Sequence, residues 1–147
     1  MNLEQIIRSI ESAAGARPVV ATIVRNDIFR LNAVPDVTYG VFAWLQGEHR
    51  SAVDDPVISW SFTFFYADRL TADRSNEIAV QSTGIEALEN VLRTLADAGI
   101  VASDYSFRTF NERFSDECAG AFCNVVLQAP KHGICPEPFE HGNPIII

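Results

Sequence analysis

Hydrophobic residues recur at helical spacing near the start of the chain. Between residues 2 and 14 they form one stripe, with polar side chains opposite: Leu3, Ile6, Ile7, Ile10, Ala13 and Ala14. This period predicts an amphipathic helix. Asn2 and Gln5 have the spacing of a capping box at its start, and Gly15 predicts a stop in left-handed geometry at its end.

A second helical stripe lies in the middle of the chain. Its apolar members are Ile85, Leu88, Val91, Leu92 and Leu95. Thr83 and Glu86 again have capping-box spacing, which predicts that this helix begins at Thr83. Gly99 follows the last apolar position and is expected to end the helix.

Between and after these helices the pattern is typical of β-strands. We predict strands at residues 19–24, 28–31, 38–46, 57–66, 105–114 and 121–128. The last two are expected to form a hairpin around residues 115–120. Residues 47–56 and 68–77 are rich in charged and turn-forming residues, and each predicts a polar loop.

The strand at residues 57–66 has the clearest alternation. Large apolar side chains occupy every second position: Ile58, Trp60, Phe62, Phe64 and Tyr66. The positions between them include Ser59, Ser61 and Thr63. Successive side chains of a strand point to opposite faces, so the aromatic face is expected in the core. The hydroxyl face either meets solvent or lies against another chain.

The regular spacing of hydrophobic residues that is typical of helices and strands ends after residue 129. Residues 130–147 contain four prolines, Phe139 and a terminal run of Ile145, Ile146 and Ile147. Prolines at this density exclude a helix or a central strand and predict an extended arm, whose apolar tip is expected to contact a partner. We therefore predict one domain at residues 1–129, with an arm at 130–147. The element order indicates an α+β fold, a mostly antiparallel sheet with two helices packed on one face.

Composition narrows the possible functions. The 147 residues carry a formal net charge of -8, and the 11 basic residues are scattered without a cluster. Specific nucleic-acid binding needs clustered Lys and Arg, so this class is disfavoured. The chain lacks a signal-peptide pattern and an apolar run long enough for a bilayer, and its 3 cysteines are typical of reduced, cytosolic thiols.

The sequence lacks the common catalytic and cofactor-binding motifs. There is no phosphate-binding glycine loop, no nucleophile elbow and no histidine pair at zinc-protease spacing. Loop carboxylates such as Asp68 and Asp73 lack the ladder of a calcium loop, and His49 is expected in an exposed turn. We predict no catalytic residue, no cofactor and no enzymatic activity.

Possible zinc ligands lie close together in sequence near the end of the chain. The last thirty residues gather the soft ligands Cys118, Cys123, His132, Cys135 and His141. No Cys-x-x-Cys pair is present, Cys118 is expected in a turn, and Cys123 faces the core with Val125 and Leu127. The interpretation as buried or incidental thiols is therefore favoured over metal binding.

Three segments carry a resemblance to a known group. Residues 64–84, which read Phe-Phe-Tyr-Ala-Asp-Arg-Leu-Thr-Ala-Asp-Arg-Ser-Asn-Glu and continue to Gln-Ser-Thr-Gly, resemble small structural proteins of Bacteroides-type (crAss-like) phages and prophages. Residues 26–32 and 35–42 are similar to the same group, so the likeness covers residues 26–98. The element order also resembles tail-terminator and tail-completion proteins, which form rings at the head–tail joint.

The resemblance implies a non-enzymatic virion protein that is assembled in the bacterial cytoplasm. Its copies would form a ring in the head–tail connector or tail, with tail or portal proteins as further partners and no membrane. An acidic surface would let DNA pass through without specific binding. The candidate subunit interface comprises Ser59, Ser61, Thr63, Asp68, Arg69, Phe139, Ile145, Ile146 and Ile147.

Two alternatives from other classes stay open. One is a small enzyme or ligand-binding module with the aromatic sheet face as the floor of its pocket. The other is a phage-encoded adaptor or inhibitor that binds a host protein through the arm.

Overall fold

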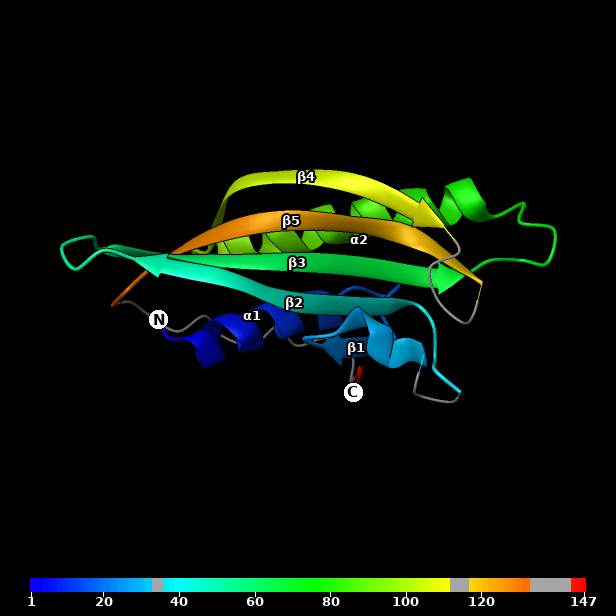
Figure 1. Cartoon of the computed structure of the whole chain (residues 1–147), viewed down its shortest axis with the longest axis horizontal. Helices are drawn as coiled ribbons and strands as arrows, with labels where there is room; N and C mark the ends of the chain where they lie inside the picture. Colours follow the sequence, from blue (N-terminus) through cyan, green and yellow to red (C-terminus); the bar gives the residue numbers. More distant parts are fainter. Residues whose placement is uncertain (33–35, 112–116, 133–143) are drawn as a thin grey trace.

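The computed structural model describes residues 1–32, 36–111, 117–132 and 144–147 (Figure 1). Within these residues, two α-helices, one 3-10 helix and six strands follow one another. Their bounds are α1 (Leu3–Gly15), β1 (Thr22–Arg25), η1 (Ile28–Asn32), β2 (Val41–Ser51), β3 (Val57–Arg69), α2 (Glu77–Asp97), β4 (Val101–Asn111), β5 (Cys118–Pro130) and β6 (Ile145–Ile146).

All the strands belong to one sheet with the order β4-β5-β3-β2-β1-β6. The ladders β2–β3, β3–β5 and β4–β5 are antiparallel, whereas β1 runs parallel to both β2 and β6. The sheet is therefore mixed but mostly antiparallel, and the predicted α+β fold is confirmed at this level.

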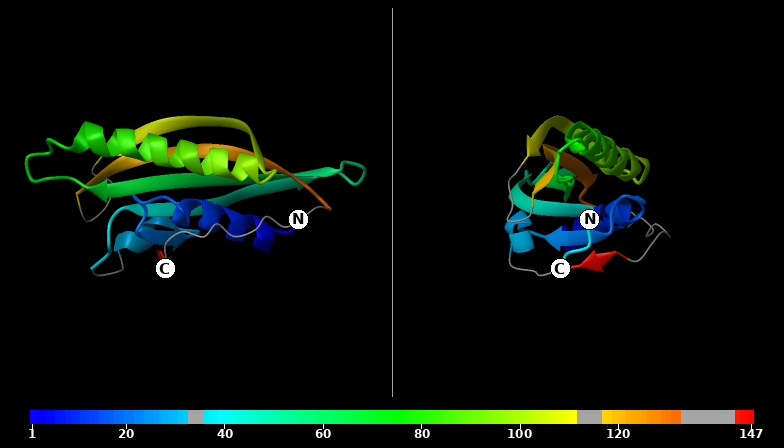
Figure 2. Two further views of the ribbon diagram at one scale, coloured as in Figure 1. Left: turned by 180° about the vertical axis from the view of Figure 1, so that it is seen from behind. Right: turned by 90° about the vertical axis from the view of Figure 1, so that its right-hand side faces the viewer.

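Both α-helices pack on the same face of the sheet (Figure 2). Helix α2 lies along β5, β3 and β4 and also contacts α1. One core cluster contains apolar residues of both helices together with the alternate aromatic residues of β3, Trp60, Phe62, Phe64 and Tyr66, each at most 5 % exposed. The prediction that the aromatic face forms the core is confirmed.

A smaller cluster lies on the other face of the sheet, under η1. The predicted strand at residues 28–31 is wrong, because these residues form the 3-10 helix η1. Ile28 and Leu31 are one 3-10 turn apart and therefore project to the same side. Both are buried against Val24, Val41 and Ala43, a contact that alternating strand geometry would not give.

The start of α1 follows the prediction and its end does not. Asn2 Oδ1 accepts a hydrogen bond from Gln5 N at 2.9 Å, and Gln5 Oε1 accepts one from Asn2 N at 2.8 Å, which completes the capping box. Gly15 is not a left-handed stop, since it is the last helical residue and Ala16 continues in right-handed geometry. A Cβ on Gly15 would lie 3.1 Å from the Pro144 ring, so the missing side chain leaves room for the end of the chain.

Helix α2 begins earlier than predicted. Its first residue is Glu77, and Thr83 lies inside the helix rather than at its N-cap. The extra turns bury Val80 on the stripe that continues through Leu88. Gly99 has φ +86°, which confirms the expected left-handed end of this helix.

Strands β2, β3 and β5 are longer than predicted, whereas β1 (Thr22–Arg25) begins later than the predicted start at residue 19. β2 continues to Ser51, so half of the predicted loop at residues 47–56 is strand, with a register shift between Gln46 and His49. His49 is not in an exposed turn, because its ring packs 5.0 Å from the Trp60 ring and 5.5 Å from the Phe62 ring, between centroids. Cys118 likewise is the first residue of β5 and buried, whereas the sequence indicated a turn.

β5 approaches β3 most closely at Gly120. A Cβ on this residue would overlap the backbone carbonyl of Tyr66 on the neighbouring strand. One position further on, Ala121 meets Gly84 of α2, where an added Cβ would lie 3.1 to 3.2 Å from Ala121 atoms. These two glycines set how tightly β3, β5 and α2 come together.

We expect Gly120→Ala to destabilise the protein by more than about 2 kcal/mol, because the methyl group must displace backbone. Gly99→Ala is the matched control. No atom lies within 4 Å of its added Cβ, so only the strain of positive φ remains, at about 1 kcal/mol. Urea unfolding monitored by circular dichroism measures both. Equal losses in the two variants would contradict a packing role for Gly120.

Candidate interaction site

The cysteines and histidines do not form a metal centre within the described part of the chain. No group of three His, Cys, Asp or Glu side chains is close enough to hold a metal ion there. Cys118 and Cys123 are both buried and belong to different core clusters. Burial raises the pKa of the Cys123 thiol to about 12, so this thiol stays protonated. Cys135 and His141 lie outside the described residues.

The hydroxyl face of β3 is open. Ser59, Ser61 and Thr63 are each half-buried and alternate with the core residues Trp60, Phe62 and Phe64, so they lie on the face opposite α1 and α2. Thr63 Oγ1 donates to Asn124 Oδ1 of β5 at 2.8 Å. Leu45 of β2 pairs with Thr63 and is 39 % exposed. Among the described residues no helix covers this part of the sheet, which leaves a polar, flat surface.

Asp68 and Arg69 lie at the far end of β3. The strand places Arg69 roughly 30 Å from Ser59, so they do not belong to the same patch. Asp68 Oδ1 accepts a hydrogen bond from Arg69 N at 2.7 Å, and the Arg69 guanidinium lies 4.9 Å from the centre of the Tyr39 ring. Arg69 is thereby engaged within its own chain by a cation–π contact.

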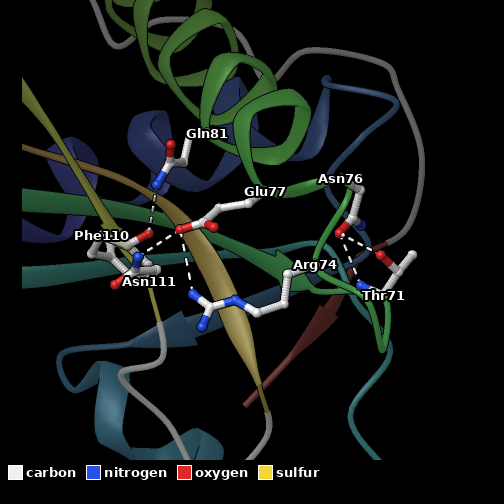
Figure 3. Close-up of polar contacts among 7 residues, drawn as sticks. All are labelled: Thr71, Arg74, Asn76, Glu77, Gln81, Phe110 and Asn111. Atoms are coloured by element: carbon white, nitrogen blue, oxygen red, sulfur yellow. Dashed lines mark hydrogen bonds and ion pairs between the residues drawn. The ribbon is translucent and has the colours of Figure 1, made fainter.

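The turn after Arg69 is held by its own polar side chains (Figure 3). Asn76 Oδ1 accepts from the backbone N of Thr71 at 2.9 Å, and Asn76 Nδ2 donates to the carbonyl of Arg69 at 3.0 Å. Because this side chain is directed back into the turn, it makes no cap bond to α2. Glu77 Oε1 then accepts from Asn111 Nδ2 at 2.5 Å, which ties the start of α2 to the end of β4.

The carboxylate of this loop has a similar local role. Asp73 Oδ1 accepts from Ser75 N at 3.1 Å and from Thr71 Oγ1 at 2.8 Å, and these bonds lower the Asp73 pKa. Asp73 Oδ1 therefore stabilises the turn itself. The loop between β3 and α2 is therefore a strand-to-helix connection held by its own side chains.

The end of the chain lies on its own sheet. Ile145 N donates to Ala21 O at 3.1 Å, and Ile147 N donates to Ile23 O at 2.9 Å, so β6 extends the sheet beside β1. Ile147 packs against the smaller core cluster, whereas Ile145 and Ile146 are 54 % and 44 % exposed. The extended conformation predicted for the arm is confirmed for these residues. Phe139 lies outside the described residues.

A groove that the sequence did not indicate lies between α1 and this new edge. It has a volume of about 820 Å³ and is lined by Leu3 and Ile7 of α1, by Trp44, and by Pro144 and Ile146. Within the described residues the indole N–H of Trp44 is buried and has no hydrogen-bond partner. Charged and polar residues also line the groove: Glu4, Arg8, Glu11, Ser12 and Arg25.

An ion pair closes one side of the groove. Arg25 Nε and one terminal nitrogen each lie 2.9 Å from an oxygen of Glu11. The Glu11 side chain is only 8 % exposed, whereas that of Arg25 is 52 % exposed. The bond to Glu11 raises the pKa of Arg25. Residue spacing cannot reveal this pair, because Glu11 has the spacing of a polar helix face and meets Arg25 only through the fold.

We expect Arg25→Met to destabilise the fold by about 1–3 kcal/mol, since it leaves the Glu11 carboxylate buried without its partner. The double variant Glu11→Met/Arg25→Met should recover part of this loss, because neither charge remains. Arg8→Met is the control at the exposed Arg8–Glu4 pair, with an effect within about 0.5 kcal/mol. Urea midpoints measure all three. A double variant that is less stable than Arg25→Met would contradict the assigned ion pair.

Stability should also respond to His49. Burial against Trp60 and Phe62 lowers its pKa below the ordinary 6.5. The unfolded chain therefore binds a proton first, and the stability that neutral His49 supports is lost as pH falls through about 6.5. We expect the melting temperature to decline from about pH 7.5 to about 5.5, and His49→Phe to flatten this decline. His132→Gln, at an exposed residue, is the control, and a decline unchanged by His49→Phe would exclude the assignment.

Comparison with known proteins adds no family to this picture. No protein-family model matches the chain, and no curated protein matches it closely enough to indicate a relative. Among the described residues no helix is long and apolar enough to cross a membrane. The function is therefore argued from the surfaces above.

Proposed function

We propose that this chain is a non-enzymatic structural subunit that assembles with copies of itself into a ring, as in a tail-terminator or tail-completion protein of a phage. In that setting the ring belongs to the head–tail connector or tail of the virion and contacts other tail or portal proteins. DNA passes through it without specific binding.

The observation that carries this proposal is the apolar edge at β6. Ile145 and Ile146 are about half exposed and form an edge strand, and no described strand pairs with their outer side. An exposed apolar edge favours pairing with another chain unless something covers it. In a ring, the neighbouring subunit would cover the β6 edge.

A ring needs a second, different patch, because its contacts run head to tail. The open face of β3, with Ser59, Ser61 and Thr63, lies away from β6 on the polar surface of the sheet. This face and the β6 edge supply two unlike surfaces on one subunit. A net charge of -8 also favours a channel wall that repels the DNA backbone.

The test is the mass of the protein in solution by light scattering, combined with negative-stain microscopy. We expect a closed ring of several subunits, and we expect Ile146→Lys to reduce it to smaller species. Ile78→Lys is the matched control, since Ile78 is 76 % exposed on α2 and far from β6 in the fold. A wild-type protein that stays a monomer at high concentration would overturn the ring.

The groove beside α1 supports a second candidate, a ligand-binding module. The aromatic face of β3 is core in this structure, so the groove lined by Trp44 takes the place of the pocket first expected there. A ligand seated in it should quench Trp44 fluorescence and raise the melting temperature, and Ile7→Glu should abolish both effects. An adaptor that binds a host protein through the arm would instead be a monomer that loses its partner on removal of residues 144–147.

A further inference from the structure

The other edge of the sheet is a long exposed strand. β4 spans Val101–Asn111 and pairs only with β5 among the described strands. Most of its residues are exposed, and Tyr105 is 44 % exposed. Backbone N–H and C=O groups along such an edge are available for pairing with another strand. Figure 1 shows β4 as the outermost strand of the sheet.

The register with β5 defines which side chains of β4 share a face. Tyr105 and Phe107 pair with Val125 and Cys123, whose side chains lie in the core under α2. These two aromatic residues therefore lie on the helix side. Asp104, Ser106 and Arg108 alternate with them and lie on the open side.

Two features limit the free part of the edge. At one end the ladder with β5 shifts between Ala102 and Asp104, and Ser103 Oγ donates to Val126 O at 3.2 Å. At the other end Gln81 Nε2 of α2 donates to Phe110 O at 3.3 Å. The regular, unoccupied edge thus comprises residues 104–109.

We propose that this edge pairs antiparallel with the same edge of a second copy of the chain, with Ser106 on the two-fold axis. In this register Asp104 of each copy lies opposite Arg108 of the other, and Tyr105 lies opposite Phe107. The pairing places opposite charges together on the open face and aromatic rings together on the helix face. Cross-strand pairs of both kinds stabilise a sheet by about 0.2–1 kcal/mol each.

The charges favour this register over registers shifted by four residues. Sliding the partner by four residues in either direction places Asp104 opposite Asp104, or Arg108 opposite Arg108. An in-register parallel pairing also places like charges side by side, which is unfavourable. Within the described residues neither Asp104 nor Arg108 takes part in an ion pair, so both are available to the second copy.

This contact is isologous and is independent of the proposed ring. Alone it produces a dimer with one continuous sheet and the α-helices of both copies on the same face. Combined with a head-to-tail contact it joins two rings back to back. Disrupting the β4 pairing should therefore leave the β6 contact intact, and disrupting the β6 contact should leave the β4 pairing intact.

Disulfide trapping tests the two-fold position. Residues opposite each other in an antiparallel ladder have Cα atoms about 4.5–5.5 Å apart, which suits a disulfide. We expect Ser106→Cys to form a covalent dimer under mild oxidation. Ser51→Cys, at an exposed position at the end of β2, and the wild-type protein, with its 3 native cysteines, are the controls. Failure of Ser106→Cys to crosslink, or equal crosslinking of Ser51→Cys, would overturn the proposal.

Charge exchange tests the register. Asp104→Arg and Arg108→Asp each place like charges opposite at two symmetric positions, so we expect each to weaken dimerisation about tenfold in sedimentation equilibrium. The double variant Asp104→Arg/Arg108→Asp restores opposite charges and should restore the dimer. A double variant that dimerises as weakly as the single variants would contradict this register. Dimerisation should persist in Ile146→Lys, whose effect is confined to the ring.

Discussion

The alternation of side-chain size along β3 is the constraint on which the rest of the structure depends. Aromatic residues on one face need a dry cover, and α1 and α2 together supply it. Ser59, Ser61 and Thr63 on the other face need none, so this part of that face stays open. Because β3 lies between β2 and β5, the same division extends to both neighbours. One strand thereby decides which side of the sheet is interior and which side is available to partners.

Local patterns in the sequence were enough to find the main elements. The helical stripe and capping box of α1, the alternation of β3 and the β4–β5 hairpin follow from side-chain period and turn residues. The errors arose where two local interpretations competed. Ile28 and Leu31 fit a short strand as well as a 3-10 turn, and the capping-box spacing of Thr83 and Glu86 occurs inside α2 rather than at its start.

The candidate surfaces were harder to predict because they depend on contacts between distant segments. Sequence analysis placed Ser59 on a face that meets solvent or another chain, but it could not tell that Ile146 lies on an edge of the protein's own sheet. The groove beside Trp44 and the pair of Glu11 with Arg25 exist only once α1, β1 and the end of the chain have come together. The exposed edge of β4 was likewise invisible, since alternation does not reveal a strand's neighbours.

The parallel pairing of β6 with β1 has a consequence for the order of folding. Ile145 is separated from its partner Thr22 by about 120 residues, among the longest sequence separations in the sheet. During synthesis β1 can pair with β2 long before Ile145 leaves the ribosome, so the other edge of β1 stays unpaired until then. A β6 strand from the same chain or from a neighbouring copy can make the same hydrogen bonds with this edge. Exchange of this strand between copies would link subunits without any new surface.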